Sequence, residues 1–216
     1  MIQKEALTKT LQQGLAVLKV AENDVALEKL VTYIETLHKW NAVHNLTAIR
    51  DPLEMVTKHL LDSLVLAPYL STGSIIDVGT GAGLPGIPLA ISNPTQNFVL
   101  LDSNQKKMTF VEHMILSLKL VNSVAICARV EQYRPEQPFD WVVSRAFSSL
   151  ADFVRVSAHL CQPAGRLVAM KGVIDPAEIA EIDSSWTIES IKQINVPGLN
   201  AARSLVFMAP NSEKRG

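Results

Sequence analysis

The sequence has little of what disulfide-rich or zinc-binding domains require. Only two of its 216 residues are cysteines, and neither belongs to a Cys-x-x-Cys or a mixed Cys/His pattern. We therefore expect no disulfide framework and no metal site. Cys127 and Cys161 each lie within an apolar segment, which predicts two reduced thiols in the protein core.

Membrane-spanning segments are also missing. The longest uncharged interval, Val78–Leu101, contains four glycines and three prolines, a composition unsuited to a transmembrane helix. The first ten residues lack the apolar core and the small-residue cleavage site of a signal peptide. These features predict a cytoplasmic protein that does not bind membranes.

The sequence has no excess of positive charge. Its 20 Lys and Arg against 21 Asp and Glu give a formal net charge of -1. Because nucleic-acid-binding proteins are usually basic overall, any RNA-binding surface here has to be a local patch. The hydrophobic content of 48% and the length fit one globular domain with a small appendage.

The first 70 residues have the period of amphipathic helices. Leucines repeat at helical spacing within Gln3–Leu18, and residues 27–37 continue the pattern after a potential cap at Asn23 or Asp24. A third helix is expected from Asp51 to Ala67, because Asp-Pro-Leu-Glu supplies a cap, a first-turn proline and an acid at the third position. We therefore predict a helical region over residues 1–70.

From residue 71 to residue 216, short apolar runs alternate with helical segments, which predicts a parallel sheet covered on both faces. The last two runs are separated only by Pro-Gly-Leu-Asn-Ala-Ala-Arg, too short for a crossover helix, so they should pair antiparallel. This α/β pattern resembles the class I S-adenosylmethionine-dependent methyltransferase fold: a Rossmann-like, seven-stranded, mostly parallel sheet with an antiparallel last hairpin. The expected strands are 74–79, 97–102, 123–127, 139–144, 166–171, 186–196 and 204–209, and the expected helices between them are 85–92, 105–118, 149–161 and 176–182.

Four glycines follow the apolar run Ser74-Ile75-Ile76, within the stretch DVGTGAGLPG at residues 77–86. A glycine turn here lets a ligand approach the backbone at the carboxyl edge of the sheet. The stretch also satisfies the dinucleotide pattern Gly-x-Gly-x-x-Gly, but S-adenosylmethionine has no phosphate and carries an ammonium, so an acid beside the turn favours it. Asp77 supplies that acid, and we expect it to attract the methionine amino group directly or through water.

Asp102 ends the second expected strand, where an acid binds ribose hydroxyls in either cofactor class. It therefore supports a bound nucleoside without distinguishing between the two cofactors. The same residue is also suited to cap the helix that follows. Asp77, Gly79, Gly81 and Asp102 are the cofactor-binding residues that these patterns predict.

Two features of base-modifying methyltransferases are missing after the fourth expected strand, which ends in DWVVSRAF. There is no Asn/Asp-Pro-Pro-Tyr motif for exocyclic amines and no cysteine for attack on a pyrimidine. Instead, four cations lie at strand ends that should meet at one edge: Arg129, Arg145, Lys171 and Arg203. Such a basic pocket suits an acceptor with a free lone pair, such as guanine N7, for which positioning and phosphate contacts are the main tasks.

Several motifs together resemble those of the ribosomal RNA small-subunit methyltransferase G family (RsmG, also called GidB). They extend from WNAVHNLTAIRD and KHLLDSL through DVGTGAGLPGIPLA, ARVEQY, SRAF and MKG to AARSLVF, and so span most of the chain. The resemblance implies methylation of N7 of guanosine 527 in 16S rRNA, within the 30S subunit, with S-adenosylmethionine as the donor. We expect a monomer, because so large a partner leaves no evident need for a dimer.

The resemblance also implies roles for individual residues. The implied cofactor contacts are Gly79, Leu84, Val130, Glu131 and Arg145. Arg129, Lys171 and Arg203 are implied to face the substrate, and we add Lys106 to this RNA-binding patch. The candidate catalytic residues are Arg145, Lys171 and Arg203.

His59, Asp62 and Ser63 match the family motif Arg-His-x-x-Asp-Ser, with Lys58 in place of the arginine. His59 and Asp62 share a helix face and are compatible with an acid/base pair. We favour an anchoring role for both, since transfer to N7 needs no base.

His44 and Asn45 are interpreted likewise as structural or substrate-adjacent.

Two other functions stay open from the sequence. One is a small-molecule S-adenosylmethionine-dependent methyltransferase, which the balanced charge favours, although such an enzyme would need a base or metal near the acceptor. The other is a non-catalytic nucleotide-binding module.

Overall fold

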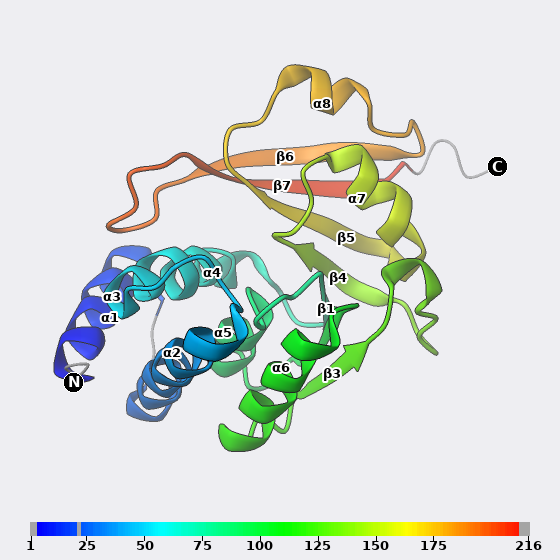
Figure 1. Ribbon diagram of the computed structural model, residues 1–216. Helices are drawn as coiled ribbons and strands as arrows, with labels where there is room; N and C mark the ends of the chain where they lie inside the picture. The colour runs from blue at the N-terminus through cyan, green and yellow to red at the C-terminus, as the bar shows by residue number, and fades with distance from the viewer. Residues whose placement is uncertain (1–3, 21–22, 212–216) are drawn as a thin grey trace.

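The computed structural model describes residues 4–20 and 23–211. Its centre is one seven-stranded sheet with the order β3-β2-β1-β4-β5-β7-β6 (Figure 1). The first five strands pair parallel, and β7 pairs antiparallel with both β5 and β6. This is the predicted α/β class and topology. The strands are β1 (Ser74–Val78), β2 (Asn97–Asp102), β3 (Ser123–Cys127), β4 (Phe139–Ser144), β5 (Cys161–Lys171), β6 (Trp186–Ile194) and β7 (Arg203–Pro210).

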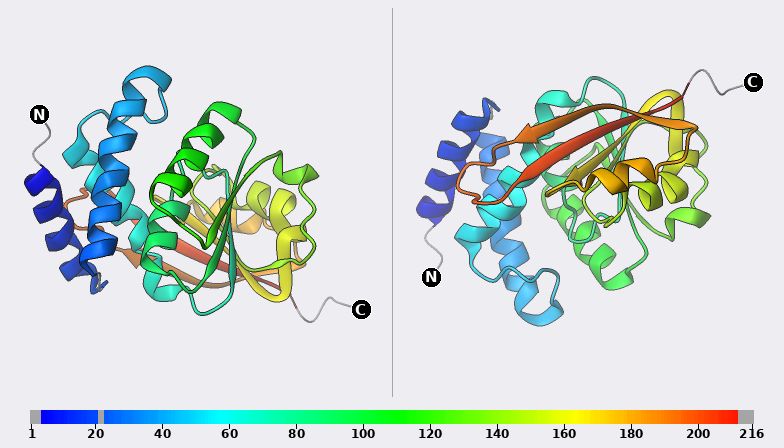
Figure 2. Two further views of the ribbon diagram at one scale, coloured as in Figure 1. Left: turned by 90° about the horizontal axis from the view of Figure 1, so that it is seen from below. Right: turned by 90° about the horizontal axis from the view of Figure 1, so that it is seen from above.

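Helices cover both faces of the sheet, which agrees with the nearly continuous burial along β1 and β7. Ile75 belongs to a core with the helical region, α5 and α6, whereas its neighbour Ile76 faces α7 on the other side. Figures 1 and 2 show these layers from three directions. The helices of this part are α5 (Gly86–Ser92), α6 (Gln105–Ser117), α7 (Leu150–Ser157) and α8 (Pro176–Ala180), with single 3-10 turns at Val130–Gln132 and Ala158–Leu160.

Two predicted boundaries were wrong around residue 161. The helix expected to end at Cys161 ends at Ser157 and is followed by a 3-10 turn. Strand β5 begins at Cys161 rather than Arg166, because Phe139 pairs with Cys161 across an irregular register with β4. Pro163 and Gly165 are unusual inside a strand, so the sequence did not predict this first half of β5.

The predicted helical region consists of α1 (Lys4–Leu18), α2 (Asp24–His44), α3 (Pro52–Met55), α4 (Asp62–Leu64) and a 3-10 turn at Ala67–Tyr69. Asn23 and Asp51 cap helices as expected, each accepting a backbone N–H. The third helix is not regular, because a π-helical turn at Val56–Leu61 separates α3 from α4. Arg145 donates to the Lys58 carbonyl of this turn.

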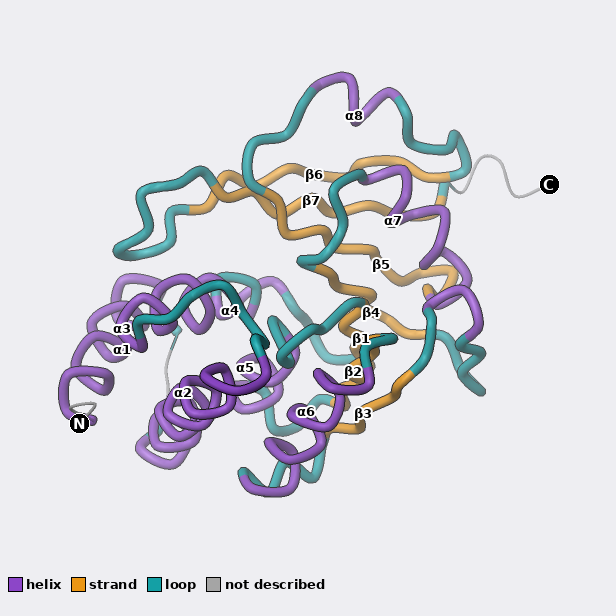
Figure 3. Tube along the Cα trace, in the orientation of Figure 1, coloured by secondary structure: helices purple, strands orange, loops and turns teal. Residues whose placement is uncertain are grey.

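One continuous core joins the helical region to the sheet. Leu30 and Ile34 of α2 share a buried cluster with Val143 of β4 and Leu205 of β7. The loop between β6 and β7 also reaches the helices: Val196 is buried there, and a Cβ at Gly198 would lie 3.4 Å from Thr57 Oγ1. Figure 3 shows this loop extending beyond the sheet toward α3.

The two cysteines differ in environment. Cys161 is buried, as predicted, but Cys127 is exposed at the end of β3. The expectation of two core thiols is therefore wrong for Cys127, which lies at the exposed end of an edge strand.

Candidate active site

The glycine loop, residues 79–86, connects β1 to α5 at the carboxyl edge of the sheet. Gly79, Gly81 and Gly83 have φ angles of +72°, +61° and +88°, which other residues rarely adopt. A Cβ at Gly79 would lie 2.7 Å from Ala146 Cβ, so this glycine lets the chain after β4 approach. A Cβ at Gly81 would have no neighbour closer than 4.0 Å, which leaves space for a ligand against the backbone.

Asp77 lies behind the glycine loop. Its Oδ2 accepts the Thr80 hydroxyl at 2.6 Å and the Gly86 N–H at 2.8 Å, and the side chain is fully buried. Burial raises the pKa of this carboxyl to about 6, although both hydrogen bonds oppose the shift. In this arrangement Asp77 holds the two ends of the loop together through Thr80 and Gly86. It is not among the residues that line the pockets described below.

Asp102 ends β2 beside the same loop. Its Oδ2 accepts the Gly81 N–H at 2.9 Å and its Oδ1 accepts the Asn104 N–H at 2.8 Å. The N-cap of α6 is Asn104, whose side chain accepts the Lys107 N–H. The capping role considered for Asp102 therefore belongs to Asn104.

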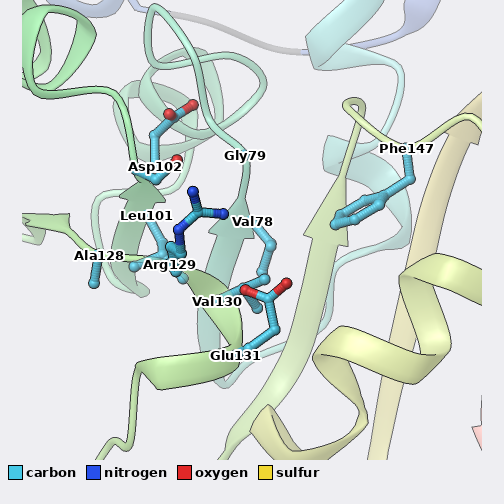
Figure 4. A pocket seen from close by; sticks show the side chains of 10 residues that line it. Val78, Gly79, Leu101, Asp102, Ala128, Arg129, Val130, Glu131 and Phe147 are labelled. Atoms are coloured by element: carbon cyan, nitrogen blue, oxygen red, sulfur yellow. The ribbon is translucent and has the colours of Figure 1, made fainter.

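A pocket that we call the Asp102 pocket opens at the ends of β1, β2 and β3. Figure 4 shows Arg129 and Glu131 projecting into it from the segment after β3, with Phe147 on the opposite side. It therefore brings together five of the predicted site residues, which are Gly79, Asp102, Arg129, Val130 and Glu131.

A second pocket, the loop pocket, lies on the other side of Gly79. The glycine loop contributes Gly81 and Leu84, and the helical region contributes Leu46, Thr47 and His59. Arg145 completes its wall. Leu46 and Thr47 belong to the family motif WNAVHNLTAIRD, but the sequence alone predicted no role for either residue.

His59 and Asp62 do not bond to each other among the described contacts. His59 Nε2 lies 2.9 Å from Thr47 Oγ1. The Asp62 carboxylate, 2% exposed, instead accepts Arg145 Nη1 at 3.0 Å and Arg203 Nε at 2.6 Å. These bonds tie the helical region to the end of β4 and the start of β7, which supports the anchoring role.

The imidazole of His59 is uncharged at neutral pH. Burial, and after it the nearby guanidinium of Arg145, together lower the pKa of His59 to about 4. A neutral imidazole adds no positive charge to a wall that already contains Arg145.

The third pocket, the Asp62 pocket, has a volume of about 350 Å³. Arg145, Lys171 and Arg203 line it, because β7 runs antiparallel and so begins where β5 ends, with Lys171 opposite Ser204. Lys171 Nζ also contacts the Ser148 carbonyl and pairs with Glu178 at 2.6 Å. Two carboxylates, Asp62 and Glu178, thus balance three cations.

The three pockets adjoin one another and share lining residues. Gly79 lines the first two, Arg145 lines the loop and Asp62 pockets, and Phe147 lines the Asp102 and Asp62 pockets. Phe147 was not singled out from the sequence, although it follows directly on Ser-Arg-Ala. Lys106 is exposed on α6 and lines none of them. Its neighbour Lys107 lies closer, with Nζ 4.0 Å from the Cβ position of Gly81.

Residues 4–20 and 23–211 contain neither a cluster of metal-ligating side chains nor a membrane-spanning helix. No group of three His, Cys, Asp or Glu side chains in these ranges is arranged to hold a metal ion. No helix in the same ranges is long and apolar enough to cross a membrane.

A glycine loop after β1, an acid at the end of β2 and a parallel sheet ending in an antiparallel hairpin define the class I methyltransferase fold. A solved structure, the glycopeptide N-methyltransferase MtfA complexed with (S)-adenosyl-L-methionine, has this fold with a TM-score of 0.60. It is 9% identical in sequence, and the match covers 71% of this chain and 87% of that chain.

The family model for rRNA small subunit methyltransferase G (GidB) matches residues 26–206. The relative with that name from Nitrosomonas eutropha is 44% identical over 96% of this chain and 99% of its own length. The one from Escherichia fergusonii is 46% identical over 89% of this chain and 93% of its own length. The chain belongs to the rRNA small subunit methyltransferase G family, and it is a methyltransferase.

Proposed function

We propose that this enzyme transfers the methyl group of S-adenosylmethionine to N7 of guanosine 527 in 16S rRNA, within the 30S subunit. The observation that carries the proposal is that pockets of two kinds lie side by side. A glycine-bounded space beside Asp102 suits a nucleoside donor, and it shares Phe147 with a pocket lined by three cations that suits a phosphate-bearing acceptor. The name of the family supports the rRNA substrate.

The residues around the glycine loop fit the cofactor. The open space beside Gly81 gives a ligand direct access to the backbone, which a larger residue would fill. We assign the nucleoside to Asp102, Val130 and Glu131, and the methionine end to the loop pocket. When bound, S-adenosylmethionine supplies an electrophilic methyl group on its sulfonium.

The Asp62 pocket is the proposed acceptor site. Guanine N7 has a lone pair and no proton to lose, so the enzyme has to position the base rather than deprotonate it. Lys171 has three N–H donors and Arg203 has five, more than their described contacts use. Both can therefore bind RNA while they keep their carboxylate partners.

Arg145 lies between the two sides of the site. It lines both the loop pocket and the Asp62 pocket, and Asp62 and the Lys58 carbonyl fix its guanidinium. We propose that Arg145 contacts the cofactor and orients it toward the acceptor. On this proposal the protein works in the cytoplasm as a monomer.

A small-molecule methyltransferase is the second candidate. The observation in its favour is that Asp62 and Glu178 neutralise much of the positive charge of the acceptor pocket. A small neutral acceptor would need less positive charge than an RNA segment does.

Calorimetry and a labelling assay test the proposal. The protein should bind S-adenosylhomocysteine and not NADH. With labelled S-adenosylmethionine, it should label 30S subunits and leave a cell metabolite extract unlabelled. Binding of NADH without S-adenosylhomocysteine would contradict the methyltransferase chemistry, and labelled metabolites with unlabelled subunits would favour the second candidate.

A further inference from the structure

Tyr33 links the helical region directly to the glycine loop. This side chain lies in the middle of α2 and is fully buried. Its hydroxyl donates to the carbonyl of Ala82 at 2.8 Å, across 49 residues of sequence. Burial raises the pKa of the phenol, so Tyr33 stays protonated and remains a donor at physiological pH.

The bond holds a segment that needs tertiary contacts to keep one conformation. Ala82 lies between Gly81 and Gly83, and both glycines have positive φ. Glycine adopts positive and negative φ about equally well, so the backbone around Ala82 has several accessible conformations. A buried partner for the Ala82 carbonyl selects the observed one, since leaving that carbonyl without a partner costs free energy.

Three different elements hold the loop. Asp77 of β1 binds Thr80 and Gly86, and Asp102 of β2 accepts the Gly81 N–H. Both acids belong to the strands beside the loop. Tyr33 comes instead from the helical region, on an element outside the sheet.

We propose that Tyr33 is a positioning residue for the cofactor: its hydroxyl holds the glycine loop in the conformation that receives the ligand. The helical region is then part of the cofactor site, which the position of Thr47 and His59 in the loop pocket also supports. The identity of the ligand rests on the proposed function, but the effect of Tyr33 on the loop does not.

The test compares Tyr33→Phe with the wild-type protein. The variant keeps the aromatic ring, which packs 6.1 Å from Phe110, and removes only the hydroxyl. The Kd for S-adenosylhomocysteine should rise about three- to tenfold, the range expected for one lost hydrogen bond. Tyr69→Phe is the matched control, because Tyr69 packs against Phe207 and Lys192 on the far strands; its Kd should stay at the wild-type value.

Two further measurements separate positioning from general destabilisation. In Tyr33→Phe, the KM for S-adenosylmethionine should rise while kcat at saturating cofactor and the KM for 30S subunits stay within about twofold of wild type. In the unliganded protein, hydrogen exchange should accelerate at the amides of Gly81, Gly83 and Leu84 and stay unchanged in β4 and β5.

Two outcomes for Tyr33→Phe would overturn the proposal. An unchanged Kd with unchanged loop exchange would show that Tyr33 does not hold the loop, and acceleration spread over the whole chain would show a merely structural role. If the wild-type protein itself fails to bind S-adenosylhomocysteine, the proposed cofactor is wrong. The exchange of the unliganded loop then still decides the role of Tyr33.

Discussion

Among single residues, the site depends on which partners neutralise its few buried charged side chains. Asp62 is the clearest case, because one carboxylate holds two guanidiniums, one just after β4 and one at the start of β7. The sequence indicated that His59 and Asp62 share a helix face, but not that each has a different partner. Arg203 is 141 residues away from Asp62, and no local pattern reveals such a pair.

Asp62→Asn should destabilise the protein by about 2–3 kcal/mol, because it leaves Arg145 and Arg203 without their carboxylate. This estimate lies at the low end for buried pairs, since both arginines keep partial access to water. Glu54→Gln, which breaks the exposed pair with Lys58, is the control and should cost less than about 1 kcal/mol. Urea unfolding measures both, and equal losses would contradict the role of Asp62 as an anchor.

Alanine at His59 or Asp62 should lower activity through stability or cofactor binding, since guanine N7 has no proton to give up. Single-turnover rates at saturating cofactor check this. A loss of several orders of magnitude in the chemical step, with normal melting and binding, would instead identify an acid/base pair.

His59 should also leave a signature in the pH dependence of stability. Its pKa is lowered from 6.5 to about 4, so the unfolded chain binds more protons between these values and stability rises with pH there. Removing this group in His59→Gln should therefore flatten the rise by on the order of 2–3 kcal/mol between pH 4 and pH 6.5. Asp77, with its raised pKa, acts in the opposite direction and partly offsets the rise in the wild-type protein.

The measurement is urea unfolding of both proteins at several pH values between 4 and 7.5. The exposed His113→Gln is the control and should follow the wild-type curve. Parallel curves for the wild-type protein and His59→Gln would mean that the imidazole is not kept neutral by burial.

Among the elements of the site, the glycine loop is held by contacts from four separate segments: β1, β2, α2 and the chain after β4. Its position between β1 and α5 was predictable, because four glycines in ten residues after an apolar run have few other uses. Its supports were not predictable, since Tyr33 and the chain after β4 reach it only through tertiary packing. The π turn at Val56–Leu61 was not predicted either, and the donor to its Lys58 carbonyl, Arg145, lies 87 residues further along the chain, just after β4.

Gly81→Val should abolish cofactor binding for two reasons. The residue has a φ of +61°, which valine adopts with strain, and the added side chain occupies the open space in front of the loop. Gly198→Val is the control, because Gly198 has a φ of +77° and lies in the loop between β6 and β7. Both variants should lose stability, but only Gly81→Val should lose binding of S-adenosylhomocysteine in calorimetry. Equal binding by the two variants would contradict the assignment of this space to the cofactor.

At the scale of the whole molecule, a protein of net charge -1 has to hold RNA with few cations. The fold and the gathering of Arg145, Lys171 and Arg203 at one edge followed from the alternation of strands and helices. The compensation of these cations by Asp62 and Glu178 did not, because it depends on side-chain placement across distant segments. The free positive charge is consequently smaller than the residue types alone indicated.

The salt dependence of RNA binding should therefore be shallow. If Lys106, Arg129, Lys171 and Arg203 neutralise three or four phosphates, the log-log slope is about -2 to -3 for single-stranded RNA. Lys171→Ala and Arg203→Ala should each reduce the slope by somewhat less than one unit while the affinity for S-adenosylhomocysteine is retained. Lys9→Ala, on α1, is the control and should leave it unchanged. A slope steeper than about -6, or unchanged slopes in both variants, would mean that RNA binds elsewhere.

The central claim is the methylation of guanine N7 in small-subunit rRNA, and nucleoside analysis of the product tests it most directly. Subunits that lack the modification are incubated with the protein and labelled S-adenosylmethionine, and the rRNA is then digested to nucleosides and mapped. Label is expected only in 7-methylguanosine, at one guanosine of 16S rRNA, and no labelling is expected when S-adenosylhomocysteine is in excess. Label in any other methylated nucleoside, or none in rRNA under conditions where the cofactor binds, would contradict it.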